Sequence, residues 1–370
     1  MTIRVLMLTK YARAGASSRV RMMDWIAPLE PHGFAFDVRP LLSDVYVRRL
    51  YDGGRTDWAD IARGYARRLA DAAAMRRFDL VWVEKELLPY VPWLERLLLA
   101  AARRPLVIDI DDAVFHYYDR SRHAAVRALL GRKIDHVFAR SALVLAGNSY
   151  LAARAVAAGA RRVEILPTVV EAARYTSRPW PEVNAGPMRI GWIGSPATQA
   201  YLGLIAGPLT DVRAATGATL TLIGARPEAA AALDAQVLAW SVESEVRDLQ
   251  TFDVGIMPLP DEPFERGKCG FKLVQYMACG LPTVASPVGV NVDIVEHGLT
   301  GFLADTAEEW RAALLRLAGD PALRATMGRA GRGRFEAGYS REGQTARVAG
   351  LLRMAAKGRE NDPRRSSANA

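Results

Sequence analysis

The most informative stretch of the chain is ERGKCGFKLVQYMACGLPTVASPVGVN, residues 265–291. Gly267 and Gly270 allow the backbone there to come close to a ligand. Lys268 and Lys272 lie four residues apart where an apolar helix begins, and the free amides of a helix start favour anions. The stretch therefore predicts an anion site. The alternative is an ordinary loop, helix and strand with solvated lysines.

The same stretch continues into a helix and a buried strand. Gln275 lies one turn beyond Lys272, so its amide is placed to reach a pair of hydroxyl groups. A helix is predicted near residues 271–279, and Gly280-Leu281-Pro282 ends it sharply. The apolar residues 282–287 that follow are expected to form a buried strand.

Strand-like and helix-like segments alternate on both sides of this unit. In the first half, continuous apolar runs such as residues 3–9 and 105–111 alternate with helical spacing, for example over residues 57–76. A continuous apolar run is expected of a parallel strand that is buried on both faces. The alternation predicts an α/β fold with parallel sheets, which bind ligands at the carboxyl ends of their strands.

The Pro-containing residues 176–187 form the best linker in the chain, and the strand pattern restarts after them. We expect two Rossmann-like domains facing each other across an interdomain cleft, which suits a reaction between two bulky substrates. The predicted divisions are a first domain at 1–183, a second domain at 187–339, a C-terminal helix at 340–357 that packs back on the first domain, and a disordered tail at 358–370.

Composition and missing motifs exclude several classes of protein. Hydrophobic residues make up 50% of the chain and charged residues 24%, which excludes a disordered or fibrous chain. Cys269 and Cys279 are too few for a disulfide scaffold or a cysteine-based zinc site. No dinucleotide-binding G-x-G-x-x-G follows the first strand, and no P-loop motif is present. The sequence shows no secretory signal and no run of about 18 apolar residues, so we expect a cytoplasmic protein.

The first half carries the whole net charge of +9. Residues 1–185 hold 29 Lys and Arg against 20 Asp and Glu, whereas residues 186–370 hold 20 of each. A basic half suggests an anionic partner, such as a phosphate-bearing substrate or an acidic membrane surface. The alternative is a solvated basic surface, since 43 of the 49 basic residues are Arg. The arginines proposed to contact an anionic membrane are Arg63, Arg67, Arg68, Arg76 and Arg77, on a helix whose Leu69 and Ala70 would face the core.

The ordered motifs resemble the retaining GT-B glycosyltransferases of family four, the glycosyl transferases group 1. The likeness runs through YMACGLPTVASPVGVNVDIVEHGLTGFL at 276–303, and MRIGWIGSPAT at 188–198 resembles the start of the family's second domain. ASSRVRM at 16–22 and PLVIDIDDAVF at 105–115 resemble first-domain segments of one bacterial branch. The resemblance covers about residues 3–355 and implies a GT-B fold that transfers a sugar from a nucleotide sugar.

The resemblance also implies a donor site in the second domain that uses no metal, no protein nucleophile and no bound cofactor, the nucleoside-diphosphate sugar being a co-substrate. The family's two glutamates fall on Gly267 and Gln275, and its Arg–Lys pair falls in the loop 195–199, which has neither. Lys268 and Lys272 are the compensating cations, and we assign them to catalysis. The predicted donor residues are Gly194, Ser195, Thr198, Trp240, Gly270, Phe271 and Gln275. For Trp240, a position in the hydrophobic core is the alternative to a contact with the donor.

Three carboxylates, Asp109, Asp111 and Asp112, lie at the end of an apolar strand in the first half. Asp111 falls on a histidine of the family, where a catalytic carboxylate would orient or deprotonate an acceptor hydroxyl. A Mg²⁺ site is one alternative, and capping of the next helix by Asp112 is another. Asn148 has two open interpretations, a functional role at the strand end or capping of the helix that follows. The acceptor-side residues are Gly15, Arg19, Arg21, Lys85 and Asp112.

These observations lead us to expect a glycosyltransferase that uses a nucleotide-sugar donor and a glycan, lipid-linked or polysaccharide acceptor. It would act in the cytoplasm, with peripheral contact to the inner face of the cell membrane as an open alternative. The missing glutamates favour a second reading, a weak or inactive sugar-nucleotide-binding partner in polysaccharide assembly. An epimerase would need acid–base residues that the sequence does not show, and nucleic acid is not expected as a partner because no aromatic and basic cluster appears.

Overall fold

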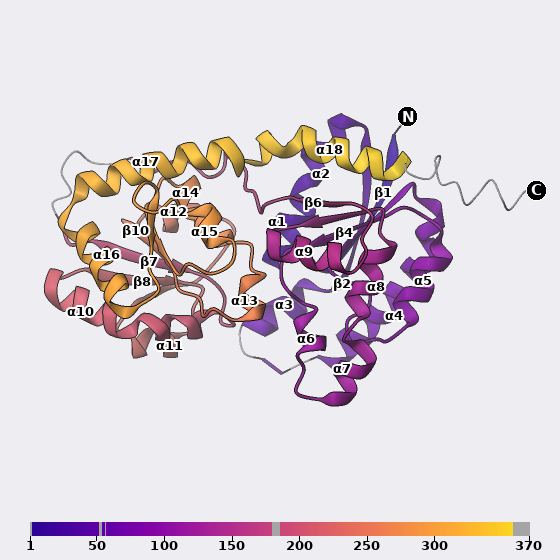
Figure 1. The fold of residues 1–370 in the computed structure, drawn as a ribbon, viewed down its shortest axis with the longest axis horizontal. Helices are drawn as coiled ribbons and strands as arrows, with labels where there is room; N and C mark the ends of the chain where they lie inside the picture. Colours follow the sequence, from indigo (N-terminus) through magenta and orange to yellow (C-terminus); the bar gives the residue numbers. More distant parts are fainter. Residues whose placement is uncertain (1, 52–53, 56, 180–185, 358–370) are drawn as a thin grey trace, which may run out of the picture. The chain divides into compact units, whose positions relative to one another are not determined.

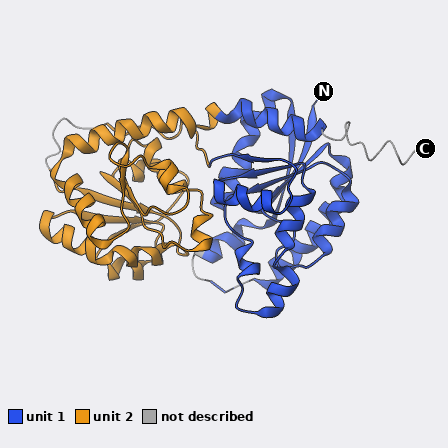
Figure 2. Cartoon of the chain, viewed as in Figure 1, with its two compact units in different colours: residues 1–167, 344–370 blue, residues 168–343 orange. Residues whose placement is uncertain are grey.

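The apolar runs of the sequence form two six-stranded sheets, and every neighbouring pair of strands is parallel. The computed structural model describes residues 2–51, 54–55, 57–179 and 186–357. Each sheet belongs to one of two compact units (Figures 1 and 2). Unit 1 comprises residues 1–167 and 344–370, and unit 2 comprises residues 168–343. The predicted disordered tail at 358–370 lies outside the described residues.

The sheet of unit 1 has the strand order β2-β1-β3-β4-β5-β6. Its inner strands β3, β4 and β5 are buried along their whole length, as their unbroken apolar sequences predict. Because the strands are parallel, the residues that follow β1, β3, β4 and β5 all lie at one edge of the sheet. The strands are β1 (Ile3–Tyr11), β2 (Phe34–Leu42), β3 (Leu80–Glu84), β4 (Leu106–Ile110), β5 (Leu143–Ala146) and β6 (Val163–Ile165).

The predicted helical region 120–140 is two helices, because the chain turns at Gly131 and Arg132 between α7 and α8. The helices of unit 1 are α1 (Ala16–Arg21), α2 (Ile26–Leu29), α3 (Asp44–Tyr51), α4 (Trp58–Ala74), α5 (Leu94–Ala102), α6 (His116–Asp119), α7 (Ala124–Leu130), α8 (Lys133–Arg140), α9 (Ser149–Ala157) and, from residue 344 onward, α18 (Arg341–Lys357).

Helix α4 packs on β2 with a face that the sequence did not identify. Leu69 and Ala70, expected to face the core, are exposed, whereas Gly64 and Arg68 are buried. A Cβ atom at Gly64 would lie 2.2 Å from the carbonyl oxygen of Leu41 in β2, so the missing side chain lets the helix approach the strand. The expectation that Leu69 and Ala70 face the core, with Arg68 on the outer surface, is therefore wrong.

The sheet of unit 2 has the strand order β12-β11-β10-β7-β8-β9. The short edge strand β9 was not predicted. The predicted helix 198–216 begins as a 3-10 segment, Gln199–Ile205, before α10. The strands are β7 (Arg189–Ile193), β8 (Thr219–Ile223), β9 (Gln236–Leu238), β10 (Val254–Met257), β11 (Thr283–Ala285) and β12 (Gly301–Leu303). The helices are α10 (Ala206–Thr216), α11 (Pro227–Ala232), α12 (Glu245–Leu249), α13 (Pro263–Arg266), α14 (Phe271–Ala278), α15 (Asn291–Ile294), α16 (Ala307–Gly319) and α17 (Pro321–Gly338).

The division between the units differs from the one expected from the linker. The sequence placed the end of the first domain at residue 183, but residues 168–179 already belong to unit 2. Arg178 explains the difference, because its amide donates to the carbonyl of Cys279 at 3.0 Å and its guanidinium pairs with Asp253 at 2.7 Å. Residues 180–185, within the predicted linker, lie outside the described residues.

Helix α18 returns the chain from unit 2 to unit 1, and the boundary at 343/344 falls in its first turn. Arg347 pairs with Glu164 of β6 at 3.3 Å. Arg353 donates to the carbonyl of His32 at 2.9 Å and lies over the ring of Phe34. Unit 1 is therefore built from two separate stretches of the chain.

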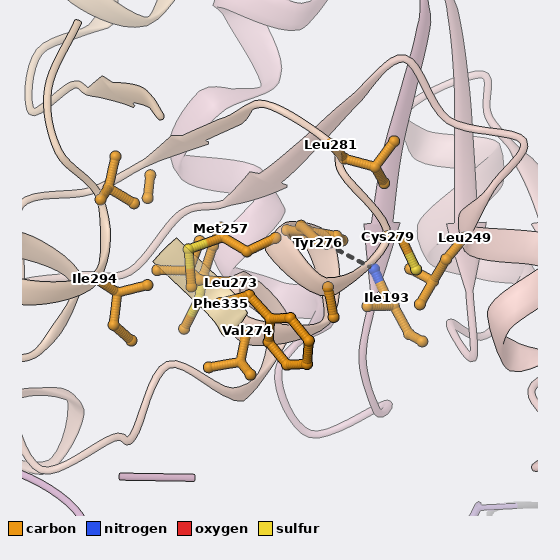
Figure 3. Packing of buried hydrophobic residues seen from close by; sticks show 14 of the residues in the cluster. Ile193, Leu249, Met257, Leu273, Val274, Tyr276, Cys279, Leu281, Ile294 and Phe335 are labelled. Atoms are coloured by element: carbon orange, nitrogen blue, oxygen red, sulfur yellow. Dashed lines mark hydrogen bonds between the residues drawn. The ribbon is translucent and has the colours of Figure 1, made fainter. Parts of the chain in front are cut away.

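The core of unit 2 includes the inner face of α14, where Tyr276 is fully buried (Figure 3). The Tyr276 hydroxyl accepts from the amide of Ile193 in β7 and donates to the carbonyl of Ile256 in β10, both at 3.2 Å. A Cβ atom at Gly255 would lie 2.4 Å from the Tyr276 ring. Residue 255 must therefore be glycine for α14 to lie this close to the sheet.

Gly255→Ala is expected to lower the free energy of unfolding by about 1–3 kcal/mol, because the added methyl group overpacks the core against Tyr276. Urea denaturation of the purified protein measures this difference. Gly203→Ala is the matched control, since a Cβ atom at Gly203 meets nothing within 4 Å. Equal loss of stability in the two variants would contradict this packing.

Candidate functional site

Three loops of unit 2 meet at the carboxyl ends of β7 and β8. Gly224, which follows β8, has a positive φ of 77°, and a Cβ atom there would lie 2.4 Å from the carbonyl oxygen of Gly194 and 3.3 Å from the Cβ of Trp240. A Cβ atom at Gly194, after β7, would lie 3.0 Å from Cε of Lys272. The two strand ends, Trp240 and the start of α14 therefore lie side by side.

The start of α14 presents backbone amides beside a lysine, and no side chain of the N-cap residue binds them. Gly270 precedes the helix with a φ of 63°, and a Cβ atom there would lie 2.3 Å from the Ile294 side chain. Lys272, in the first turn, is half-buried and holds its Nζ 5.4 Å from the centre of the Trp192 ring. Helix amides and an ammonium group together attract anions. The structure therefore brings Lys272 and the helix amides together, and the binding of an anion there stays a prediction.

Lys268 lies before α14 and contacts different aromatic rings. Its Nζ is 4.9 Å from the centre of the Phe264 ring and 6.0 Å from that of Tyr201. Only Lys272 of the two lysines is part of the helix. The sequence predicted both lysines on one side of a turn. In the structure their ammonium groups contact different rings, those of Phe264 and Tyr201 for Lys268 and that of Trp192 for Lys272.

Gln275 is part of a buried polar network. Its amide donates to the Tyr175 hydroxyl at 3.2 Å, and that hydroxyl donates to Glu245. Trp240 donates its indole N–H to the other oxygen of Glu245 at 2.7 Å, and Arg174 pairs with the same carboxylate at 3.0 Å. Burial and the Glu245 carboxylate raise the pKa of Tyr175 well above its ordinary value. Gln275 is thus linked to a buried carboxylate through a neutral tyrosine.

A second group of polar residues lies at the carboxyl edge of the unit 1 sheet. Ser17 donates its hydroxyl to Glu84 at 3.0 Å and lies 2.6 Å from an oxygen of Asp111. Ser18 donates to Glu84 at 2.5 Å. Glu84 also accepts from the backbone amide of Lys10 at 2.8 Å. The first turn of α1 is therefore tied to the ends of β3 and β4.

Lys85 neutralises two of the three aspartates. Its Nζ lies 2.9 Å from Asp111 and 3.0 Å from Asp112, and its backbone has a φ of 59°. Burial disfavours the charged form of Asp111, but the attraction of Lys85 and Arg21 outweighs this effect. Together they hold the pKa of Asp111 below its ordinary value. The aspartates in turn raise the pKa of Lys85 well above its usual range. Asp111 is therefore ionised at neutral pH.

The third aspartate, Asp109, is held by Arg21. The guanidinium forms two bonds to the carboxylate, at 2.8 and 3.1 Å, and donates to the carbonyl of Leu166 at 2.8 Å. Burial raises the pKa of Asp109 to about 6, against the attraction of Arg21. Arg19 is also buried and donates to the carbonyl of Arg13 at 3.3 Å. Both arginines thus bind groups of unit 1 itself.

Known proteins resemble this chain in sequence and in fold. Residues 188–320 match the family described as Glycosyl transferases group 1. HepE from Anabaena, solved in complex with UDP-glucose, has a similar fold with a TM-score of 0.71 at 15% identity, covering 96% of this chain and 100% of that one. Sucrose-phosphate synthase from Thermosynechococcus elongatus has a TM-score of 0.69 at 15% identity, covering 95% and 98%.

The family match therefore lies in unit 2, and the chain has the GT-B fold. A D-inositol 3-phosphate glycosyltransferase from Pseudarthrobacter chlorophenolicus is 40% identical over 92 residues, which are 24% of this chain. A protein of the same name from Arthrobacter is 40% identical over 80 residues. The matched stretches span about a fifth of the length of these curated relatives.

The remaining residues assigned to the donor site of this glycosyltransferase fold have local roles. Thr198 closes the turn after β7, because its amide and its hydroxyl both donate to the carbonyl of Ser195, at 2.9 and 3.2 Å. Phe271 packs against the core of unit 2, and so does the half-buried Trp240. Trp240 is therefore not a fully buried core residue: it packs at the edge of the core and lies beside Gly194 and Gly224.

In unit 1, two capping alternatives have different outcomes. Asn148 caps α9 by accepting from the amide of Leu151 at 2.9 Å. Asp112 was a candidate cap for the next helix, but α6 begins without a side-chain cap and Asp112 pairs with Lys85 instead. A Cβ atom at Gly15 would lie 2.5 Å from the Cβ of Tyr11, so glycine is needed in that turn.

The sequence missed Glu84, Glu245 and Tyr175. Glu84 directly precedes Lys85 at a strand end, and that position was the available signal. Tyr175 and Glu245 lie 70 positions apart, so no local pattern indicates their bond. Within the described residues, no three His, Cys, Asp or Glu side chains are grouped as a metal site. No described helix has the length and apolar character needed to cross a membrane.

Lys85→Met is expected to lower the free energy of unfolding by about 3 kcal/mol, because it removes the cation that Asp111 and Asp112 share. Chemical denaturation followed by circular dichroism measures the change. The triple variant that also carries Asp111→Asn and Asp112→Asn is the control, and it should recover most of the loss. A triple variant no more stable than Lys85→Met would show that the ion pairs are not the cause.

Proposed function

We propose that the chain is a retaining glycosyltransferase that moves a sugar from a nucleoside-diphosphate sugar to a glycan, lipid-linked or polysaccharide acceptor. The observation that carries the proposal is the convergence of Gly194, Gly224 and Lys272 beside the first amides of α14. This arrangement would bind an anion at the carboxyl ends of parallel strands, where α/β folds bind nucleotides. The match of residues 188–320 to the group 1 glycosyl transferases supports the same reaction.

A uridine nucleotide is the donor that we propose. HepE from Anabaena, which shares the fold, was solved with UDP and with UDP-glucose. The diphosphate would lie against the amides of Phe271 and Lys272, with Lys268 and Lys272 as the cations. As the bond to the sugar breaks, negative charge accumulates on the leaving diphosphate. Groups already aimed at that charge stabilise it without reorganising during the reaction.

The acceptor hydroxyl is assigned to the polar edge of unit 1, and Asp111 is its proposed partner. Asp111 is ionised, because Lys85 and Arg21 lower its pKa, so it can accept a hydrogen bond from a hydroxyl group. Ser17 and Lys85 fix the carboxylate in position. Acceptor-side contacts of Gly15, Arg19, Arg21 and Asp112 stay proposals, and the buried bonds of Arg21 favour an indirect role through Asp109.

One observation favours a second candidate function, a sugar-nucleotide-binding partner with little or no turnover. Gln275 stands where the family has a glutamate, and its amide bonds to Tyr175 instead of carrying a charge. An amide can still bind a ribose hydroxyl, since it both donates and accepts. The two candidates share nucleotide binding and differ only in sugar transfer.

UDP is expected to stabilise the folded protein, because a ligand that binds only the native state adds to its free energy of unfolding. At a hundredfold excess over Kd the gain is about 2.7 kcal/mol, and thermal unfolding with and without UDP measures it. Uridine is the control that lacks the diphosphate. No shift with UDP, GDP or ADP at saturation would refute the donor site.

Lys272→Ala is expected to reduce sugar transfer or donor hydrolysis about 10²–10³-fold, because it removes a charge aimed at the leaving diphosphate. The fold should persist, since Ala is a good helix former and Lys272 is only half-buried. Rate measurements with UDP-sugars test this, with Lys357→Ala at the exposed end of α18 as the control. Wild-type activity in Lys272→Ala would place the diphosphate elsewhere, whereas UDP binding without any turnover in the wild type would favour the second candidate.

A further inference from the structure

One side of unit 1 exposes large apolar side chains. Trp93 is 65% exposed, directly before α5, and Leu97 on α5 is 64% exposed. Leu94 on the same helix and Leu129 on α7 are exposed as well, at 37% and 52%. Helices of a folded protein normally turn such side chains inward. Apolar groups gathered on a surface mark a binding surface when they are contiguous.

A pocket of about 190 Å³ joins these elements. Trp93 and Arg96 line it from the α5 side, and Leu129, Arg132 and His136 line it from α7, α8 and the turn between them. Figure 1 shows these helices together in unit 1, with α4 next to α5. We call the exposed residues Trp93, Leu94, Arg96, Leu97, Leu129 and Arg132 the Trp93 surface.

The backbone before α5 is held in an unfavourable conformation. Tyr90 and Trp93 have φ values of 58° and 55°, a region that bulky side chains rarely adopt. Both residues are nevertheless more than 60% exposed, although the Tyr90 ring meets the ring of Tyr118 edge-on, so burial in the core does not explain the conformation. Strain of this kind concentrates at functional positions. Here it turns two aromatic side chains toward solvent.

The exposed charges from α4 to the end of α5 have one sign. Over residues 58–104, the exposed charged side chains are all arginines, whereas five of the six carboxylates are buried and Asp79 is half-buried. Glu95, which lines the pocket, is 1% exposed and is paired with Lys133. The exposed arginines in this stretch are Arg63, Arg67, Arg76, Arg77, Arg96 and Arg103.

We propose that the Trp93 surface docks the protein on an anionic lipid bilayer. Tryptophan and leucine enter the interface between head groups and acyl chains, while arginines at the same level bind lipid phosphates. A second copy of the chain fits less well, because joining two such surfaces would bring like charges together. The sequence assigned membrane contact to α4. Since Arg68 is buried there, the proposal moves the centre of that contact to α5, α7 and their pocket.

Vesicle flotation of the full chain, without nucleotide, tests the proposal. The protein should bind vesicles of phosphatidylcholine with phosphatidylglycerol, and binding should fall steeply as salt is raised. Arg96→Glu with Arg132→Glu should weaken the partition coefficient about tenfold or more. Trp93→Ala with Leu97→Ala should also weaken it. Thermal unfolding and the response to UDP should be unchanged in each variant, since these side chains lie on the surface.

The control variants are Leu204→Ala and Arg329→Glu in unit 2, where Leu204 is 54% exposed and Arg329 is exposed. Both should bind anionic vesicles like the wild type. Equal binding to pure phosphatidylcholine vesicles, no binding to anionic vesicles at low salt, or full binding by the Trp93 surface variants would each overturn the proposal. Because the assay contains no donor, such a failure leaves the proposed sugar transfer untouched.

Discussion

The hydroxyl of Tyr276 holds α14 on the sheet of unit 2, and the candidate donor site depends on that contact. It bonds to an amide of β7 and a carbonyl of β10, two neighbouring strands, while its ring fills the space left by Gly255. Tyr276 lies four residues after Lys272 and one after Gln275. Fixing this one ring therefore fixes where the helix amides, the lysine and the Tyr175–Glu245 network lie relative to the strand ends.

In unit 1, several carboxylates lie at one edge of the sheet, and nearby cations offset their mutual repulsion. Each of the three aspartates at the end of β4 has a cation within hydrogen-bonding distance, Arg21 for Asp109 and Lys85 for Asp111 and Asp112. An isolated buried carboxylate would take up a proton instead. The paired arrangement preserves a charged acceptor for hydrogen bonds, and it leaves these side chains with partners other than a metal.

Most strands and the helix at α14 could be predicted, because parallel strands buried on both faces leave unbroken apolar runs and glycines mark the helix ends. The strand β9 could not be predicted, since Gln236–Leu238 has only three residues and begins with an exposed polar one. The burial of Arg19, Arg21 and Arg68 could not be predicted either, because arginine is ordinarily a surface residue. The partner of Arg21 lies 88 positions away. Local sequence reports secondary structure well and long-range ion pairing poorly.

The discontinuity of unit 1 has a consequence for the order in which the chain acquires its structure. Unit 2 is one uninterrupted segment, so none of its contacts depends on residues that follow position 343. Unit 1 lacks α18 until the ribosome has passed through the whole of unit 2. Until then β6 lacks the ion pair between Arg347 and Glu164, and the carbonyl of His32 lacks its bond from Arg353. The half that is translated first is therefore the half that is completed last.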